Sequence, residues 1–466
     1  MKTMTAIFCW AISCALFAQN LELEKYLDEV KRSNESYKAL KLRSKSLNDL
    51  SAEADLIYSS KLESSLYHVD NSRPNSSPST LGVKTTQNTA SIAVSKPTSY
   101  GVEGSVSYNV ANTEIDGASS TVIPENKYYE NYAELKISQS LYRNFLGREI
   151  KSKDESIRKS AKAGKAEQDF KMKNLLSDAE NIYYQYIIAG KRVQIQEAAK
   201  ERAESLAKWT LSKTKKNLAD NADYLQAESA LQSRELDLLL AKHNLRSIAQ
   251  IFNSLRGVNS SVISEKVELS IVDHTKNLTA PQKNEFRLDT LAIKYSAEAE
   301  MAQAIASSEV LKPDLKLNGS AAFYGKTNGL SDATSDSFGS KNPVYSIGLS
   351  LSMPLDFSAK ERAQSAYLAK SQAAQLEVKR KEFDDAREWE DLLTSFEELK
   401  DQLKVYNKLE EIQRRKAINE RKRQKNGLST TFQVLSFEQE YLSTLSLRLS
   451  KQAELIQTYT QLKLFN

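Results

Sequence analysis

The chain has 466 residues, of which 27% are charged, with a formal net charge of +5 and only 14 glycines and 8 prolines. So few turn-forming residues predict a few very long elements rather than several compact domains. A small net charge spread over dense mixed charges is typical of the solvated faces of long helices, and it gives no reason to propose a nucleic-acid partner.

The amino terminus has the pattern of a secretory signal peptide. Lys2 precedes an apolar stretch from Ala6 to Leu16, and small residues follow, so we predict a signal peptide over residues 1–18. In an alternative reading, a weak lipobox places a lipid on Cys14. The only other cysteine is Cys9, so the mature chain is expected to have neither a disulfide nor a thiolate metal site. No later stretch approaches the ~18 apolar residues of a transmembrane helix.

Long helical patterns fill most of the chain. They cover residues 21–66, 147–214, 284–311, and a run after Pro354 that continues to Gly427. Residues 215–220 read as a turn, and residues 327–342 as a polar loop. After the turn, apolar residues seven apart predict a coiled-coil seam; these are Tyr224, Leu231, Leu238, Leu245 and Phe252.

Short runs with a period of two interrupt the helices. In the clearest one, Ile347, Leu349 and Leu351 alternate with serine and glycine, which predicts a strand with one apolar and one small polar face. Pro354 ends this strand because it has no amide hydrogen to donate. Similar runs are found at residues 100–110, 132–141 and 315–323, with a weaker one at 91–95 and a possible hidden strand at 64–69.

The two halves of the sequence correspond at an offset of 210 residues. Asn217-Leu218 matches Gly427-Leu428, and the residues that follow Leu218 match those that follow Leu428. We therefore predict a first repeat over residues 19–256 with strands within 62–142, a linker over 257–281, and a second repeat over 282–466 with a hairpin at 313–356.

Strands of about ten residues with one apolar face suit a transmembrane barrel, whose outside meets lipid and whose lumen is wet. A soluble sheet packed against a core is the alternative, but the long helices have seams of their own. A lipid-exposed sheet must close, and so few strands cannot enclose a water-filled lumen within one chain. The pattern thus predicts an oligomeric barrel with an even number of strands in each half.

Four motifs and their order resemble TolC-like outer-membrane efflux proteins over essentially the whole mature chain. They are the doubled plan, the strand-to-helix junctions at residues 137–144 and 351–357, the turn from Gly427 to Leu435, and the strand opening at residues 311–317. The resemblance implies a mixed, mostly α fold in which three chains build a twelve-stranded transmembrane β-barrel, continued by a barrel of long antiparallel coiled-coil helices. It also implies a passive exit duct in the outer membrane of a Gram-negative bacterium, extending into the periplasm. Its partners would be a periplasmic adaptor and the inner-membrane pump of a tripartite efflux or type I secretion system.

The resemblance also suggests where the duct narrows and where the adaptor binds. A periplasmic constriction is expected at Asp220, Asp223, Gln433 and Ser436. The tips that would contact the adaptor are Asn217, Leu218, Gly427 and Leu428. In the alternative reading, Asp220 and Asp223 only cap the following helix. Three cations precede the turn at Gly427; they are Lys422, Arg423 and Lys425. They either complement the dipole at the end of their helix or form ion pairs with Asp220 and Asp223 at the other turn.

No enzyme, cofactor or metal signature accompanies these features. The three histidines lie far apart, at His68, His243 and His274. We expect a non-enzyme. A second hypothesis, an exported coiled-coil scaffold without a pore, explains the heptads but not the two-faced strands.

Overall fold

The structure is a computed structural model that describes residues 20–267, residue 275 and residues 278–466. The predicted signal peptide and Cys14 lie outside these residues. The chain forms two compact units. Unit 1 contains the residues up to Ser44, Glu167–Asp289 and Glu382–Asn466, and unit 2 contains Lys45–Ala166 and Thr290–Lys381.

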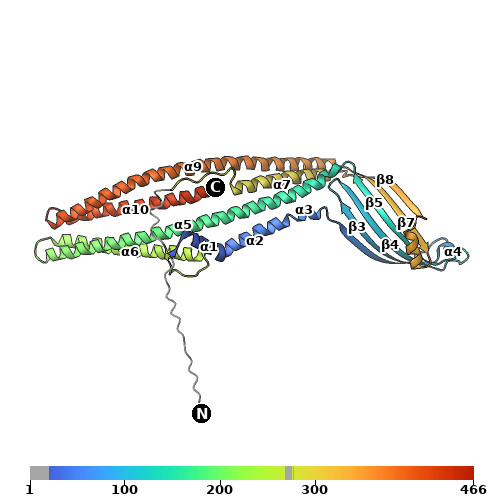
Figure 1. Cartoon of the computed structure of the whole chain (residues 1–466), viewed down its shortest axis with the longest axis horizontal. Helices are drawn as coiled ribbons and strands as arrows, with labels where there is room; N and C mark the ends of the chain where they lie inside the picture. The colour runs from blue at the N-terminus through green and yellow to red at the C-terminus, as the bar shows by residue number, and fades with distance from the viewer. Residues whose placement is uncertain (1–19, 268–274, 276–277) are drawn as a thin grey trace, which may run out of the picture. The chain divides into compact units, whose positions relative to one another are not determined.

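Unit 2 is built on a six-stranded antiparallel sheet (Figure 1). Its strands, in spatial order, are β2 (Lys61–Asn71), β3 (Lys84–Pro97), β4 (Val102–Asp116), β5 (Lys127–Ser140), β7 (Asp314–Thr327) and β8 (Pro343–Ser352). The two strands from the second half of the sequence continue the sheet of the first half, because β5 pairs with β7. The expected alternation therefore produces one continuous sheet with β2 and β8 as its edges.

The strand count differs from the four per chain that the resemblance implies. The helical pattern predicted over residues 21–66 ends early, as α1 (Leu23–Ser33), α2 (Glu35–Leu50) and the short α3 (Glu53–Leu56). Residues 61–71 instead form β2, which pairs with β3 from Lys61 to Asn71. The hidden strand suspected near residues 64–69 is thus real. A long-range ladder outweighs the local helical pattern, since tertiary context overrides propensity.

The expected polar loop at residues 327–342 contains a helix, α8 (Leu330–Ser337). This helix packs on the sheet: Asn131 Nδ2 donates to Thr334 Oγ1 at 3.0 Å, and the ring of Tyr108 stacks on that of Phe338 with centroids 5.4 Å apart. A second short helix, α4 (Pro78–Leu81), lies in the β2–β3 connection. Both helices are one or two turns long, so periodicity gives little sequence signal for them.

Two very long helices pass through the boundaries between the units: α5 (Arg148–Thr214) after the 3₁₀ turn η1 (Phe145–Gly147), and α9 (Phe357–Lys425). In unit 2, α7 (Leu288–Val310) packs through a stripe of small side chains, which allows close approach of the backbones. Its buried alanines are Ala292, Ala297, Ala299, Ala302 and Ala306. Lys159 of α5 and Glu298 of α7 also form an ion pair at 2.5 Å.

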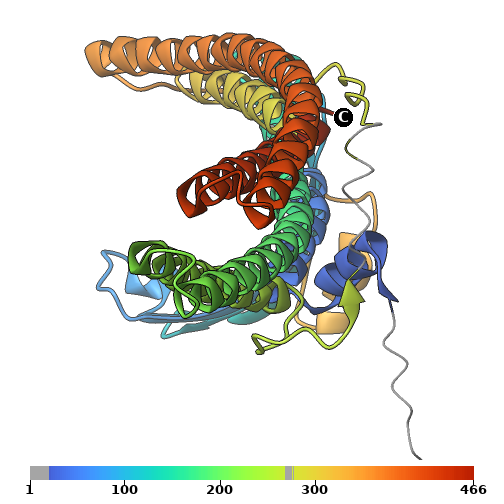
Figure 2. The same cartoon turned by 90° about the vertical axis from the view of Figure 1, so that its left-hand side faces the viewer.

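In unit 1, α5 and α9 each continue into an antiparallel partner, α6 (Asn221–Leu255) and α10 (Thr431–Leu462), as both views show (Figures 1 and 2). The 3₁₀ turn η3 (Lys463–Phe465) follows α10. Helices α5 and α10 pack together through Ile188, Leu449 and Ile456. The α6 seam is partly confirmed: Phe252 is fully buried, whereas Leu231, Leu238 and Leu245 are only half-buried.

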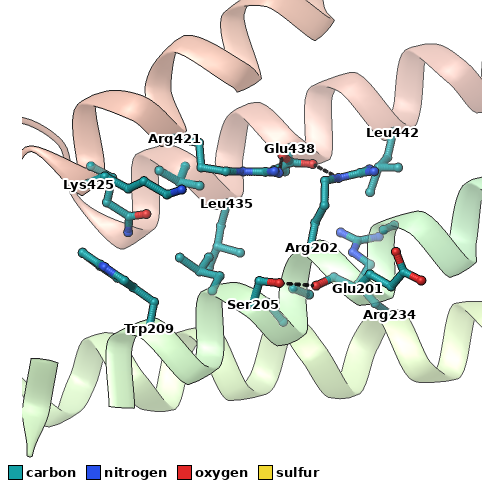
Figure 3. A pocket seen from close by; sticks show the side chains of 16 residues that line it. Glu201, Arg202, Ser205, Trp209, Arg234, Arg421, Lys425, Leu435, Glu438 and Leu442 are labelled. Carbon is teal, nitrogen blue, oxygen red and sulfur yellow. Dashed lines mark hydrogen bonds and ion pairs between the residues drawn. The ribbon is translucent and has the colours of Figure 1, made fainter. Parts of the chain in front are cut away.

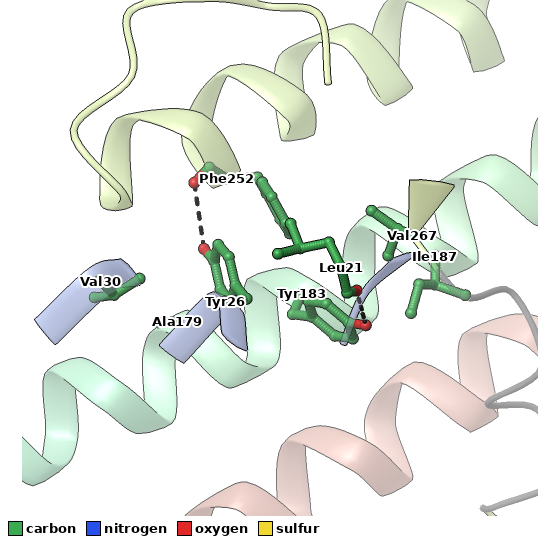
Figure 4. Packing of buried hydrophobic residues seen from close by; sticks show 8 residues of the cluster. All are labelled: Leu21, Tyr26, Val30, Ala179, Tyr183, Ile187, Phe252 and Val267. Carbon is green, nitrogen blue, oxygen red and sulfur yellow. Dashed lines mark hydrogen bonds between the residues drawn. The ribbon is translucent and has the colours of Figure 1, made fainter. Parts of the chain in front are cut away.

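A hydrophobic core of unit 1 joins α1, α5 and α6 (Figure 4). The rings of Tyr26 and Phe252 stack with centroids 4.1 Å apart, and Tyr183 lies beside both. The Tyr183 hydroxyl donates to the backbone oxygen of Leu21 at 2.8 Å, which satisfies its buried polar end. A short parallel pair, β1 (Asn20–Leu21) with β6 (Lys266–Val267), closes this core.

Candidate functional site

The sheet of unit 2 has two chemically different faces. The register places one residue of each strand in a single cross-strand row, and the side chains of that row lie on one face. A representative row is Leu62, Val94, Val106, Leu135, Ala321 and Tyr345. Leu349, on the same face, is 68% exposed. Large apolar side chains exposed this widely point to an apolar environment outside the isolated chain.

The opposite face is polar and internally hydrogen-bonded. The hydroxyls of Ser65 and Ser91 lie 2.6 Å apart. Ser138 Oγ donates to Asn318 Oδ1 at 2.9 Å, and Asn318 Nδ2 donates to Ser350 Oγ at 3.1 Å, so that three strands are linked in one chain of bonds. These small polar groups hydrogen-bond equally well to water, so this face suits contact with solvent.

The junction between β5 and α5 explains one of the motifs behind the resemblance. Arg143 donates to both carboxylate oxygens of Glu149, at 2.8 and 3.1 Å. Asn144 has a left-handed φ of 55°, and its Oδ1 accepts from the Ile150 backbone N–H at 3.2 Å, which satisfies a free donor of the helix start. The motif therefore fixes how the sheet passes into the helix.

The two helical turns of unit 1 have the same geometry, 210 residues apart. Asn217 and Gly427 both have a left-handed φ, of 54° and 73°. The Leu218 N–H donates to the Lys213 oxygen, and the Leu428 N–H to the Arg423 oxygen, each at 2.9 Å. These are the hydrogen bonds of a helix C-cap closed by a left-handed residue.

Two of the predicted constriction residues act as caps of the following helices. Asp220 Oδ1 accepts from the Ala222 N–H at 3.3 Å at the start of α6. Gln433 completes a capping box with Thr430 at the start of α10. Asp223, in the first turn of α6, and Ser436, in the second turn of α10, are both half-buried.

The suggested ion pairing between the two turns is not formed within the described part of the chain. No ion pair there joins Lys422, Arg423 or Lys425 to the two acids. Arg423 pairs instead with Glu420 of its own helix at 3.3 Å, and its guanidinium also donates to the Leu428 oxygen. The cations of this tip therefore stabilise their own turn.

Replacing Gly427 with alanine is expected to loosen its turn. No atom lies within 4 Å of the position that a Cβ would take, so the penalty comes only from the left-handed backbone. That penalty is about 1–2 kcal/mol and raises the open fraction of the turn about five- to thirtyfold. The rate of tryptic cleavage after Lys425 measures this open fraction. Asn217→Gly, at the equivalent turn, should slow cleavage after Lys215; equal rates in both variants would contradict this account.

A cavity of about 490 Å³ lies between the two hairpins of unit 1, close to their tips (Figure 3). Glu438 of α10 lines it, and its carboxylate pairs with Arg202 of α5 at 3.0 Å and also with Arg421 of α9. Trp209 and Lys425 also line it. Sequence reasoning missed this site because its charges come from four helices that periodicity does not align.

The cavity is rich in positive charge. Burial lowers the pKa of the Arg202 guanidinium, and burial together with the charge of Arg202 lowers the pKa of Arg421. Both stay protonated at neutral pH because a guanidinium group is effectively always charged in proteins. One carboxylate, that of Glu438, is therefore shared by two cations and ties α10 to both α5 and α9.

Replacing Glu438 with glutamine is expected to destabilise the pairing of the two hairpins by about 1–3 kcal/mol, because two guanidinium groups lose their shared counter-charge. Thermal unfolding followed by circular dichroism measures the loss, and added salt should recover part of it. Glu201→Gln is the matched control, since the Glu201 carboxylate lines the same cavity without an ion pair among the described residues. Equal destabilisation by both variants would argue against a central role of Glu438.

Comparison with known proteins places this fold among outer-membrane channels. Outer-membrane channels of known structure share it over nearly the whole chain. CusC, whose structures describe transmembrane channel formation, matches with a TM-score of 0.68 and 13% identity, over 96% of this chain and 92% of CusC. VceC, an outer-membrane protein of Vibrio cholerae, matches with a TM-score of 0.65 and 15% identity, over 95% and 94%. The MtrE outer-membrane channel of Neisseria gonorrhoeae matches with a TM-score of 0.65 and 14% identity, over 95% and 88%.

The sequence itself matches no family model and no curated protein. The resemblance to TolC-like efflux proteins is thus confirmed at the level of the fold, which is mixed, mostly helical, and contains an antiparallel sheet. CusC and MtrE, which share it, are described as channels, and VceC as an outer-membrane protein. Within the described residues, no helix has both the length and the apolar character to cross a bilayer.

Proposed function

We propose that this protein is an outer-membrane channel, the passive exit duct of a tripartite efflux pump or a type I secretion system. The two-faced sheet is the observation that carries the proposal. Its apolar face is exposed, its opposite face is hydrogen-bonded and polar, and its two edge strands are exposed along nearly their whole length. Sheets from sister chains would close into a transmembrane barrel, since unpaired edge amides are not tolerated in lipid.

A homotrimer is the assembly that the resemblance implies, and the helices of unit 1 support self-association. Helices α6 and α9 carry large apolar side chains that are exposed in the single chain; they include Leu236, Leu239 and Leu240 on α6 and Val405 and Ile412 on α9. Stripes of this kind mark protein interfaces. In the proposed assembly they pack between neighbouring chains to build the α-helical tunnel.

The partners would be a periplasmic adaptor and an inner-membrane pump that supplies the energy. The adaptor would bind the hairpin tips, at Asn217, Leu218, Gly427 and Leu428. Leu218 and Leu428 are each 66% exposed, so each tip presents one apolar side chain in the same place. A small apolar knob beside an ordered turn offers a partner helix a defined contact.

The periplasmic constriction would lie at the start of α6 and α10, at Asp220, Asp223, Gln433 and Ser436. Asp220 and Gln433 are engaged in capping, whereas the Asp223 carboxylate has no side-chain hydrogen bond or ion pair among the described residues. Three copies of Asp223 facing a narrow pore would favour cations over anions.

Neutralising Asp223 is therefore expected to reduce the cation preference of the channel. Asp223→Asn should move the reversal potential under a salt gradient towards zero, while Asp220→Asn, which still caps α6, should leave it nearly unchanged. The measurement uses single channels in planar bilayers. If Asp220→Asn produced the larger shift, the carboxylate that faces the pore would be that of Asp220 and not that of Asp223.

The channel itself is tested by cell fractionation and by conductance. The protein should accompany the outer membrane, extract as an oligomer in detergent, and give discrete conductance steps in planar bilayers. A monomer that stays in the periplasm without detergent and never conducts would overturn the proposal and favour the pore-free scaffold.

A further inference from the structure

The sheet supplies two strands more than the resemblance implies, and these are β2 and β3. We propose that β2 and β3 belong to the barrel wall, so that each chain contributes six strands and three chains close an eighteen-stranded barrel with a lumen for large hydrophilic cargo. This inference rests on the proposed channel function and adds the size of its pore.

The apolar face extends across the extra strands. Strand β3 pairs with β4 through the whole length from Lys84 to Pro97. Leu62 and Leu66 of β2 are 68% and 84% exposed, and Ile92 and Val94 of β3 are also exposed, on the same face as Val106 and Leu135. If the β2–β3 hairpin lay outside the bilayer, these apolar side chains would be exposed to water. Their transfer into lipid therefore favours a position of the hairpin in the barrel wall.

The two edges are complementary. Because every neighbouring pair is antiparallel and the number of strands is even, β2 and β8 run in opposite directions. They are 11 and 10 residues long. The β8 edge of one chain can therefore pair antiparallel with the β2 edge of the next, so that the apolar face stays outside and the polar face inside.

Strand number sets the width of the lumen. At a spacing of ~4.8 Å and a tilt of ~40°, each strand takes about 6.3 Å of circumference. Eighteen strands then give a backbone radius of about 18 Å, against about 12 Å for twelve. Allowing about 5 Å for each side-chain layer leaves a lumen about 26 Å across, compared with about 14 Å for twelve strands.

The polar face also indicates the kind of cargo. Its charges are mostly paired with one another: Lys136 with Glu134 at 3.0 Å, Lys316 with Asp314 at 3.4 Å, and Lys326 with Glu130 at 3.8 Å. The wall is thus hydrophilic and nearly neutral, which suits large water-soluble cargo rather than one class of ion. A polypeptide with paired helices, each 10–12 Å wide, would pass a lumen of about 26 Å but not one of about 14 Å.

Electron cryomicroscopy of the full-length assembly in lipid nanodiscs counts the strands directly. Three chains with eighteen strands are expected. Three chains with twelve strands and the β2–β3 hairpin folded outside the wall, or two chains with twelve strands, would overturn this inference and leave the channel function intact. Failure to form any barrel or conducting pore would overturn the channel function itself.

A shortened chain provides the matched comparison. The start of β2 lies beside the end of β3, at the same end of the strands. Residues 61–97 can therefore be replaced by a Gly-Ser-Gly linker without changing the direction in which β4 runs. The shortened chain should assemble with twelve strands and a barrel cross-section reduced about twofold. An unchanged barrel diameter would contradict the inference, and if this variant fails to assemble, the strand count of the intact chain decides.

Discussion

Leu349→Lys is expected to abolish assembly in the outer membrane. Leu349 lies on the apolar face of β8 and is 68% exposed, so in a barrel its side chain meets acyl chains. A lysine on the lipid face costs about 2–4 kcal/mol near the middle of the bilayer, and every chain of the assembly carries that penalty. The amount of oligomer recovered from outer membranes should fall more than tenfold.

The neighbouring position provides the control. Gly348 lies on the polar face of the same strand, and no atom lies within 4 Å of a Cβ placed there. Gly348→Lys should therefore assemble like the unaltered chain, with its charged group in the wet lumen. If both lysine variants assembled equally well, the apolar face would not be in contact with lipid.

Phe252→Ala is expected to have the largest effect on the stability of unit 1. Phe252 is fully buried and stacks on Tyr26 at 4.1 Å, in the core that joins α1, α5 and α6. Truncating a buried phenylalanine lowers the free energy of unfolding by about 3–5 kcal/mol, through lost burial and the cavity that remains. Thermal unfolding in detergent, followed by circular dichroism, measures this change.

Phe432→Ala is the matched control, because Phe432 is 64% exposed at the start of α10. Its replacement should change the free energy of unfolding by no more than about 0.5 kcal/mol. A similar small change for Phe252→Ala would mean that the aromatic core does not hold α1 and α6 to α5.

Local signals in the sequence were enough to predict the long helices, the hairpin tips and most of the strands. Helix α5 begins and ends within one residue of the predicted limits, because charged helical periodicity runs unbroken between Gly147 and Thr214. Gly427 marks its turn because glycine adopts a positive φ without strain. Strand β8 ends before Pro354 as expected.

What the sequence could not reveal depends on contacts between distant segments. Residues 61–71 carry a weak alternation that competes with a helical pattern, and only pairing with β3 makes them a strand. Helix α8 is held by Tyr108 and Asn131, which are about two hundred residues away in sequence. The ion pairs of Glu438 with Arg202 and Arg421 likewise join three helices, and no spacing in the sequence predicts them.

The central claim is that one face of the sheet meets lipid while the other lines water. Spin labels at Leu349 and at Ser350, in protein reconstituted into lipid bilayers, test it most directly. The label at Leu349 should be accessible to oxygen and shielded from a water-soluble nickel chelate, and the label at Ser350 should show the reverse. Equal accessibility of both labels to the chelate would contradict the account.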